Sequence, residues 1–182
     1  MFKLRDLLQL AAIATIAVVL NGCAAKDRRT LGSQIDDNSI VIKAGNAIEA
    51  NKTLDEKANI NVYSYNGVIL LTGQAPNQAM VEEAGELVRP VQGAKDVQNQ
   101  IRVGNPTSFT TRSRDSWITT RVKSLLLADK EISALNIRVI TENGEVFLMG
   151  IVTEQEGDKA VEIARHVNGV SRVIKAFETQ YN

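Results

Sequence analysis

Apolar and polar positions follow the same order twice along this chain. Residues 66–73, NGVILLTG, reappear as residues 143–150, NGEVFLMG, and residues 84–93 match residues 160–169. The offset is 77 residues for the first block and 76 for the second. Self-similarity of this kind is typical of a duplicated structural unit. The sequence therefore predicts two copies of one small domain.

Each copy opens with a predicted helix, over residues 39–52 in the first copy and 115–128 in the second. At 100° per residue, the apolar side chains of each segment gather on one side of the helix. This stripe consists of Ile40, Ala44, Ala47 and Ile48 in the first copy and of Ile118, Val122, Leu125 and Leu126 in the second. We expect the stripe to face the core in both copies.

A two-stranded hairpin follows, and both copies join its strands by Asn-Gly. This pair is the strongest short hairpin signal, because both residues tolerate a positive φ. Gly73 and Gly150 stand at the far end of the second strand. In the second copy, apolar residues alternate toward one face of the hairpin, at Ile137, Val139, Val146 and Leu148.

A second helix and a last strand complete each unit. The helix is predicted over residues 77–91 and 154–167, each followed by a glycine suited to the C′ position. The strand is predicted over residues 97–103 and 173–179. The order α-β-β-α-β predicts an α+β fold in which two helices pack on a three-stranded sheet.

The N-terminus has the layout of a secretory signal. Lys3 and Arg5 precede an apolar run over residues 7–20, and Gly22 precedes Cys23, the one cysteine of the chain. The run is shorter than the roughly 20 residues that a transmembrane helix needs. A lone cysteine also forms no intrachain disulfide. An N-terminal membrane anchor with an incidental cysteine is the alternative interpretation.

The segment Leu20-Asn21-Gly22-Cys23 resembles the lipobox of bacterial lipoproteins. The resemblance implies that residues 1–22 are removed and that Cys23 becomes the acylated N-terminus. In the sorting rule of Gram-negative lipoproteins, an aspartate after the cysteine retains the protein in the inner membrane. Ala24 occupies that position, which implies the outer membrane, facing the periplasm.

Charge separates the two copies. The chain has 21 basic and 21 acidic residues, a balance that argues against nucleic acid as a partner. Residues 36–104 hold 6 basic and 9 acidic residues, a net charge of −3, whereas residues 112–182 hold 10 of each. Four cations of the second copy gather around the first half of its opening helix, at Arg112, Arg114, Arg121 and Lys123.

That helix carries a second surface beside its core stripe. The surface consists of Trp117, Thr120, Ser124 and Leu127, with Arg121 and Lys123 at its borders. The first copy has Ser39 and Glu49 where the second has Trp117 and Leu127. An exposed Trp and Leu beside cations are typical of a helix that lies in a membrane interface. The alternative is that Trp117 packs against the other domain or covers the edge of its own core.

Nothing in the sequence indicates catalysis or a cofactor. His166 is the only histidine, and we expect it to face solvent or to cap its helix. No cluster of Cys and His suits zinc, and no phosphate-binding or serine-hydrolase motif occurs. The pair Asp36-Asp37 is predicted to be solvated. We expect no enzyme activity, no cofactor and no metal site.

The repeated unit, with its hairpin glycine and the glycine before the last strand, resembles the BON domain. Together with the lipobox, it resembles the dual-BON outer-membrane lipoproteins of division and envelope stress. The resemblance implies phospholipid binding or envelope attachment, with lipid contact on the first helix of the second domain. We expect the division to be a signal peptide, a lipidated tether, BON domain 1, a linker and BON domain 2, over residues 1–22, 23–35, 36–104, 105–112 and 113–182.

Two functions remain open from the sequence. In the first, Trp117, Thr120, Arg121, Lys123, Ser124 and Leu127 bind anionic phospholipids such as phosphatidylglycerol or cardiolipin. This function would support envelope integrity and localisation to division sites. In the second, the chain is an adaptor for envelope proteins, with contacts around Tyr63, Tyr65 or the acidic helix of the first copy. The two tyrosines are expected to be exposed. Phe109, in the linker, is expected to pack on a domain rather than to contact a ligand.

Overall fold

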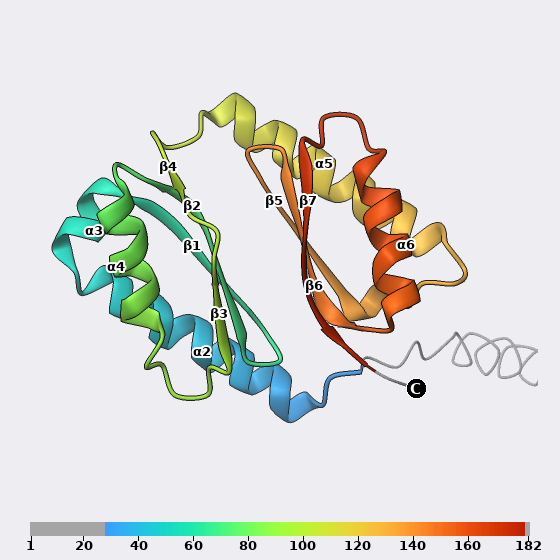
Figure 1. The fold of residues 1–182 in the computed structure, drawn as a ribbon, viewed down its shortest axis with the longest axis horizontal. Coiled ribbons are helices and arrows are strands. Elements are labelled where there is room, and N and C mark those ends of the chain that lie inside the picture. Colours follow the sequence, from blue (N-terminus) through green and yellow to red (C-terminus); the bar gives the residue numbers. More distant parts are fainter. Residues whose placement is uncertain (1–27, 181–182) are drawn as a thin grey trace, which may run out of the picture.

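The computed structural model describes residues 28–180. The predicted signal peptide and Cys23 lie outside this range. Two α+β units follow one another, and their sheets lie face to face in the middle of the molecule (Figure 1). Helices cover the outer face of each sheet. The predicted fold class, two tandem units with helices packed on a sheet, is confirmed.

The first unit is built around a central strand, β2. Strand β1 pairs with β2 in antiparallel register, and β3 and β4 both pair with β2 in parallel. Its elements are α2 (Leu31–Glu49), α3 (Lys52–Lys57), β1 (Asn59–Tyr65), β2 (Val68–Ala75), α4 (Gln78–Val88), β3 (Asp96–Asn99) and β4 (Arg102–Val103). The short helix α3 is absent from the predicted order.

The second unit repeats this arrangement around β6. Strand β5 is antiparallel to β6, and β7 is parallel to it. Its elements are α5 (Phe109–Ala128), the 3₁₀ turn η1 (Ala134–Asn136), β5 (Ile137–Glu142), β6 (Glu145–Val152), α6 (Glu154–Arg165) and β7 (Arg172–Thr179).

The predicted last strand of the first unit is divided into β3 and β4. The register on β2 is the same on both sides of the break. The side chain of Asn99 accepts a hydrogen bond from the backbone N–H of Ile101 at 3.3 Å, and Ile101 turns into the core. The hydrogen bond from Ile101 to the Asn99 side chain marks the break, while the N–H of Gln100 still donates to the carbonyl oxygen of Leu71 on β2.

Both opening helices begin earlier than the apolar stripe predicts. Thr30 and Ser108 cap them, and each side-chain oxygen accepts from the backbone N–H three residues later. Such caps satisfy N–H groups that have no partner within the helix. Helix α5 therefore starts at Phe109, inside the expected linker. The expectation that Phe109 packs on a domain is wrong, because its side chain is 78% exposed.

Two buried aspartates hold the hairpin turns against the helices. Asp37 accepts hydrogen bonds from the backbone N–H groups of Asn66 and Gly67, at 2.8 and 2.9 Å. Asp115 accepts from the equivalent turn residues of the second unit, at 2.7 and 2.8 Å. The prediction that Asp36-Asp37 is solvated is therefore wrong for Asp37, which is buried. Its carboxylate is buried because it accepts the hydrogen bonds of the backbone N–H groups in the turn.

Each unit has its own core beneath its helices, and a third cluster joins the two sheets. The predicted helix stripes and the alternating hairpin residues lie in the first two cores, with two exceptions: Leu125 packs against its core partly buried, and Ala47 is partly buried outside the core cluster. The third cluster consists of Tyr65, Leu70, Ile140, Phe147, Met149 and Ala176. The expectation that Tyr63 and Tyr65 are exposed is wrong. Tyr63 packs against this cluster, and Tyr65 is buried and donates its hydroxyl to the carbonyl oxygen of Asn136.

Candidate functional site

The predicted lipid-binding surface lies on the outer side of α5. Trp117 is 54% exposed and Leu127 is 63% exposed. The other four predicted residues, Thr120, Arg121, Lys123 and Ser124, are also exposed. Ile118, Val122 and Leu126, on the opposite side of the helix, fill the core. The alternative in which Trp117 is sealed against the first domain does not describe this structure.

The hydroxyl groups of this surface are paired within the helix. Thr120 donates to the carbonyl oxygen of Ser116, and Ser124 donates to that of Thr120, both at 2.9 Å. Such i−4 bonds satisfy the hydroxyl hydrogen without water. Moving the strip between Trp117 and Leu127 out of water therefore costs less free energy than it would if these hydroxyl groups were unpaired.

Two cations border the strip without partners in the fold. Neither Arg121 nor Lys123 forms a hydrogen bond or an ion pair within residues 28–180. Arg112 and Arg114, by contrast, donate to the carbonyl oxygens of Thr107 and Gly169. Of these four cations, Arg121 and Lys123 are thus the two that remain available to an external anion.

An apolar groove continues the surface past the end of α5. It has a volume of about 210 Å³ and is lined by Lys123, Leu126, Leu127, Ala134, Leu135, Ile137 and Val139. Leu135, on η1, is 56% exposed. It was not among the predicted residues, because η1 is a single short turn without a periodic pattern. The signal that could have indicated this part of the groove is the presence of apolar residues between α5 and β5.

Residues 28 and 29 bind both domains where the chain enters the fold. The guanidinium of Arg28 pairs with Glu156 and donates to the carbonyl oxygen of Ile151. Its backbone N–H donates to the side chain of Asn136 at 2.7 Å. Arg29 lies 3.5 Å from the carboxylate of Asp37 and over the ring of Tyr65. The segment before α2 is therefore fixed at the junction of the two domains.

Arg28 also sets the ionisation of Glu156. Burial acts to raise the pKa of this carboxyl. The hydrogen bond from Arg28 and those from the backbone of Thr153 and Ser133 outweigh burial and lower the pKa to about 2. Glu156 therefore remains a carboxylate over the whole neutral range.

The described residues give no indication of a metal centre. Within residues 28–180, no three side chains of His, Cys, Asp and Glu are grouped to hold a metal. His166 is the C-cap residue of α6, and its Nδ1 lies 2.7 Å from the carbonyl oxygen of Glu162. No helix of the same range has the length and apolar character to cross a bilayer.

Comparison with known proteins places both units in one family. The BON domain model matches residues 36–105 and 114–181. The chain is 38% identical to outer membrane lipoprotein DolP of Haemophilus influenzae over 188 residues, 96% of this chain and 97% of that protein.

Two further relatives share most of this length. The chain is 44% identical to the 21 kDa hemolysin of Actinobacillus pleuropneumoniae over 151 residues, 83% of this chain and 78% of that protein. It is 29% identical to osmotically-inducible protein Y of Escherichia coli (strain K12) over 153 residues, 82% of this chain and 76% of that protein.

Proposed function

The chain belongs to the BON domain family, as an outer-membrane lipoprotein with two such domains, and from this premise we propose that its second domain binds anionic phospholipid. The role is non-enzymatic. It supports the integrity of the outer membrane and directs the protein to regions rich in anionic lipid, such as division sites. Phosphatidylglycerol and cardiolipin are the partners that fit the charge of the surface.

The exposure of Trp117 and Leu127 beside two unpaired cations carries this proposal. A Trp ring is stable at the depth of the headgroups, because its body is apolar and its N–H remains wet. Each Lys or Arg near an anionic membrane adds about 1 kcal/mol of attraction. Arg121 and Lys123 together thus supply about 2 kcal/mol, which disappears on a neutral bilayer.

Acylation of Cys23 is the second membrane contact of the proposal. Each buried methylene of an acyl chain contributes roughly 0.8 kcal/mol, and stable anchoring takes more than one signal. The acyl chains hold the protein to the membrane, whereas the α5 surface responds to the lipid composition. The two contacts thus have separate roles.

A liposome flotation assay tests the proposal on a form that begins at Ala24 and has no acyl chain. We expect this form to float with vesicles that contain phosphatidylglycerol or cardiolipin and to remain unbound with phosphatidylcholine alone. Trp117→Glu and Leu127→Glu should each weaken binding about tenfold, since each replaces an inserted apolar group by a repelled charge.

Ile42→Glu is the matched control. Ile42 is 62% exposed on α2, at the position equivalent to Thr120, so the substitution makes the same kind of change on the first domain. It should leave flotation unchanged. Equal binding by the wild type and both α5 variants would remove the α5 surface from the proposal.

The adaptor function has lost the two tyrosines on which it was partly based. Tyr65 is 3% exposed and lies between the sheets, with Tyr63 packed beside it. A partner protein must therefore use another face of the first domain.

A further inference from the structure

The two domains can be superposed residue by residue around the Asn-Gly turn. Asp37 and Asp115 bind the turn amides in the same way. The carbonyl oxygen of Gly67 accepts from the N–H of Lys95, and that of Gly144 accepts from the N–H of Ser171, both at 2.8 Å. Ile40 and Ile118 lie equally close to the glycines that follow the second helix, Gly93 and Gly169. These contacts make Asp36 of the first domain the counterpart of Arg114.

In the second domain, Arg114 fills the space beside Gly169. Its Nη2 atom donates to the carbonyl oxygen of Gly169 at 3.3 Å. The Nε and Nη2 atoms both lie 3.1 Å from the point where a Cβ of Gly169 would stand. The guanidinium thus lies against the glycine and donates a hydrogen bond to its carbonyl oxygen.

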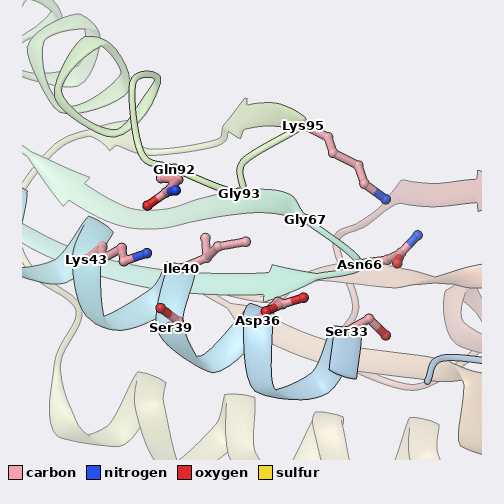
Figure 2. A pocket seen from close by; sticks show the side chains of 10 residues that line it. All are labelled: Ser33, Asp36, Ser39, Ile40, Lys43, Asn66, Gly67, Gln92, Gly93 and Lys95. Carbon is pink, nitrogen blue, oxygen red and sulfur yellow. The ribbon is translucent and has the colours of Figure 1, made fainter. Parts of the chain in front are cut away.

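In the first domain the same space is open. Apart from its chain neighbours, only Ile40 among residues 28–180 lies within 4 Å of the Cβ position of Gly93. The carbonyl oxygen of Gly93 receives no hydrogen bond within residues 28–180. A cavity of about 390 Å³ lies there, between α2, the Asn66-Gly67 turn and the loop at Gly93 (Figure 2). Asp36, on its wall, places a carboxylate where the second domain has its own cation.

We propose that this cavity receives an arginine side chain of a partner protein. The guanidinium would take the position that Arg114 holds in the second domain, donating to the Gly93 carbonyl oxygen and to the carboxylate of Asp36. Hydrogen bonds from a guanidinium to a carboxylate are about twice as strong as neutral ones. The side chain of Ile40 provides the apolar surface on which the arginine stem packs.

The charges around the cavity are compatible with a bound guanidinium. Residues 36–104 have a net charge of −3. Lys43 lines the far end of the cavity. Its counterpart, Arg121, lies two helical turns from Arg114, about 10 Å along the axis, so a cation at that position is compatible with a guanidinium. Lys95 extends toward Asn66 and away from Gly93 (Figure 2).

An NMR titration of the ¹⁵N-labelled full chain in detergent tests the proposal directly. The probe is Nα-acetyl-arginine amide. We expect saturable shifts of the amide signals of Gly67, Gly93 and Lys95, with the millimolar affinity of a single side chain. Nα-acetyl-citrulline amide, which is neutral and of similar shape, should bind about tenfold more weakly. Equal effects of both probes, or saturable shifts with inorganic phosphate and none with the arginine probe, would overturn the proposal.

A second and independent measurement gives each of the two equivalent positions, Asp36 and Arg114, the residue type of the other. Asp36→Arg should fill the cavity from within and abolish the arginine-dependent shifts at Gly93. Arg114→Asp should open the equivalent space and produce new shifts at Gly144 and Gly169. Asp55→Arg makes the same change of charge away from the cavity and should keep wild-type binding. Retention of probe binding by a folded Asp36→Arg chain contradicts the proposal. If that variant does not fold, the wild-type titration and Arg114→Asp still decide the question.

Discussion

Asp37 and Asp115 occupy equivalent places in the two domains, and each receives the two backbone N–H groups of an Asn-Gly turn. The turns were predictable, because Asn and Gly tolerate the positive φ that both turns adopt. The aspartates were not, because an acidic residue near a helix start is commonly exposed. Their partners lie about 30 residues further along the chain, beyond the reach of any local pattern.

Loss of one such carboxylate should destabilise the fold. We expect Asp115→Ala to lower the free energy of unfolding by about 3 kcal/mol, because it leaves the buried N–H of Gly144 and the partly buried N–H of Asn143 without an acceptor. Asp36→Ala removes an exposed carboxylate from α2 and should change stability by less than about 0.5 kcal/mol. Urea denaturation of both variants measures the difference. Equal midpoints would contradict the role assigned to the buried aspartates.

The pair of Glu156 with Arg28 predicts a pH dependence. The pKa of Glu156 falls from 4.5 to about 2 on folding. A lowered pKa stabilises the folded state above pH 4.5, and this contribution is lost as the pH falls from 4.5 toward 2. The difference in stability between the wild type and Glu156→Gln should therefore be constant from neutral pH down to about pH 5.5 and shrink below 4.5. Thermal unfolding at several pH values tests this expectation. A difference that grows on acidification would contradict it.

At the scale of elements, duplication made the order of helices and strands predictable. The spacing of Ile118, Val122 and Leu126 fixed the buried side of α5, and therefore also the side that carries Trp117. The starts of α2 and α5 were not predicted, since they depend on single capping residues, Thr30 and Ser108. Helix α3 and the turn η1 are too short to produce a periodic pattern.

The close approach of β1 and β2 depends on one glycine. A Cβ atom at Gly73 would overlap the carbonyl oxygen of Asn59, and φ at Gly73 is +115°. We expect Gly73→Ala to cost about 3 kcal/mol or more, because both the overlap and the backbone conformation are unfavourable. Gly45→Ala is the control, since nothing lies within 4 Å of its Cβ position on α2. It should stabilise the protein by about 1 kcal/mol. Denaturation curves that rank the two variants in the opposite order would disprove this account.

At the scale of the molecule, the docking of the two sheets was the main feature that the sequence pattern left open. The apolar residues of β2 run without interruption from Val68 to Leu71, a pattern typical of a strand that is buried on both faces. Ile69 and Leu71 face the helices, and Leu70 faces the other sheet. The alternation in the hairpin of the second domain predicts only one buried face. Tyr63 and Tyr65, on the second face of the first sheet, were expected in solvent because no buried partner for that face was predicted.

A charge in the shared cluster should separate the domains without unfolding them. Leu70→Glu places a carboxylate in the apolar interface, while the core beneath each set of helices keeps its residues. We expect a larger radius of gyration in small-angle X-ray scattering and two unfolding transitions in place of one. Ile42→Glu, on the outer surface, should retain the compact shape. An unchanged radius for Leu70→Glu would contradict the assignment of this cluster to domain docking.

The fixed position of Arg28 restricts how far the protein can stand from its lipid anchor. Four residues lie between it and Cys23, and the five fully extended steps from Cα to Cα span roughly 17 Å. Asn136, which holds the backbone of Arg28, directly follows Leu135 of the apolar groove. An acylated Cys23 would thus confine the α5 surface to a thin layer above the bilayer. In that layer the effective concentration of lipid is high, so even a weak intrinsic affinity of the second domain is sufficient for occupancy.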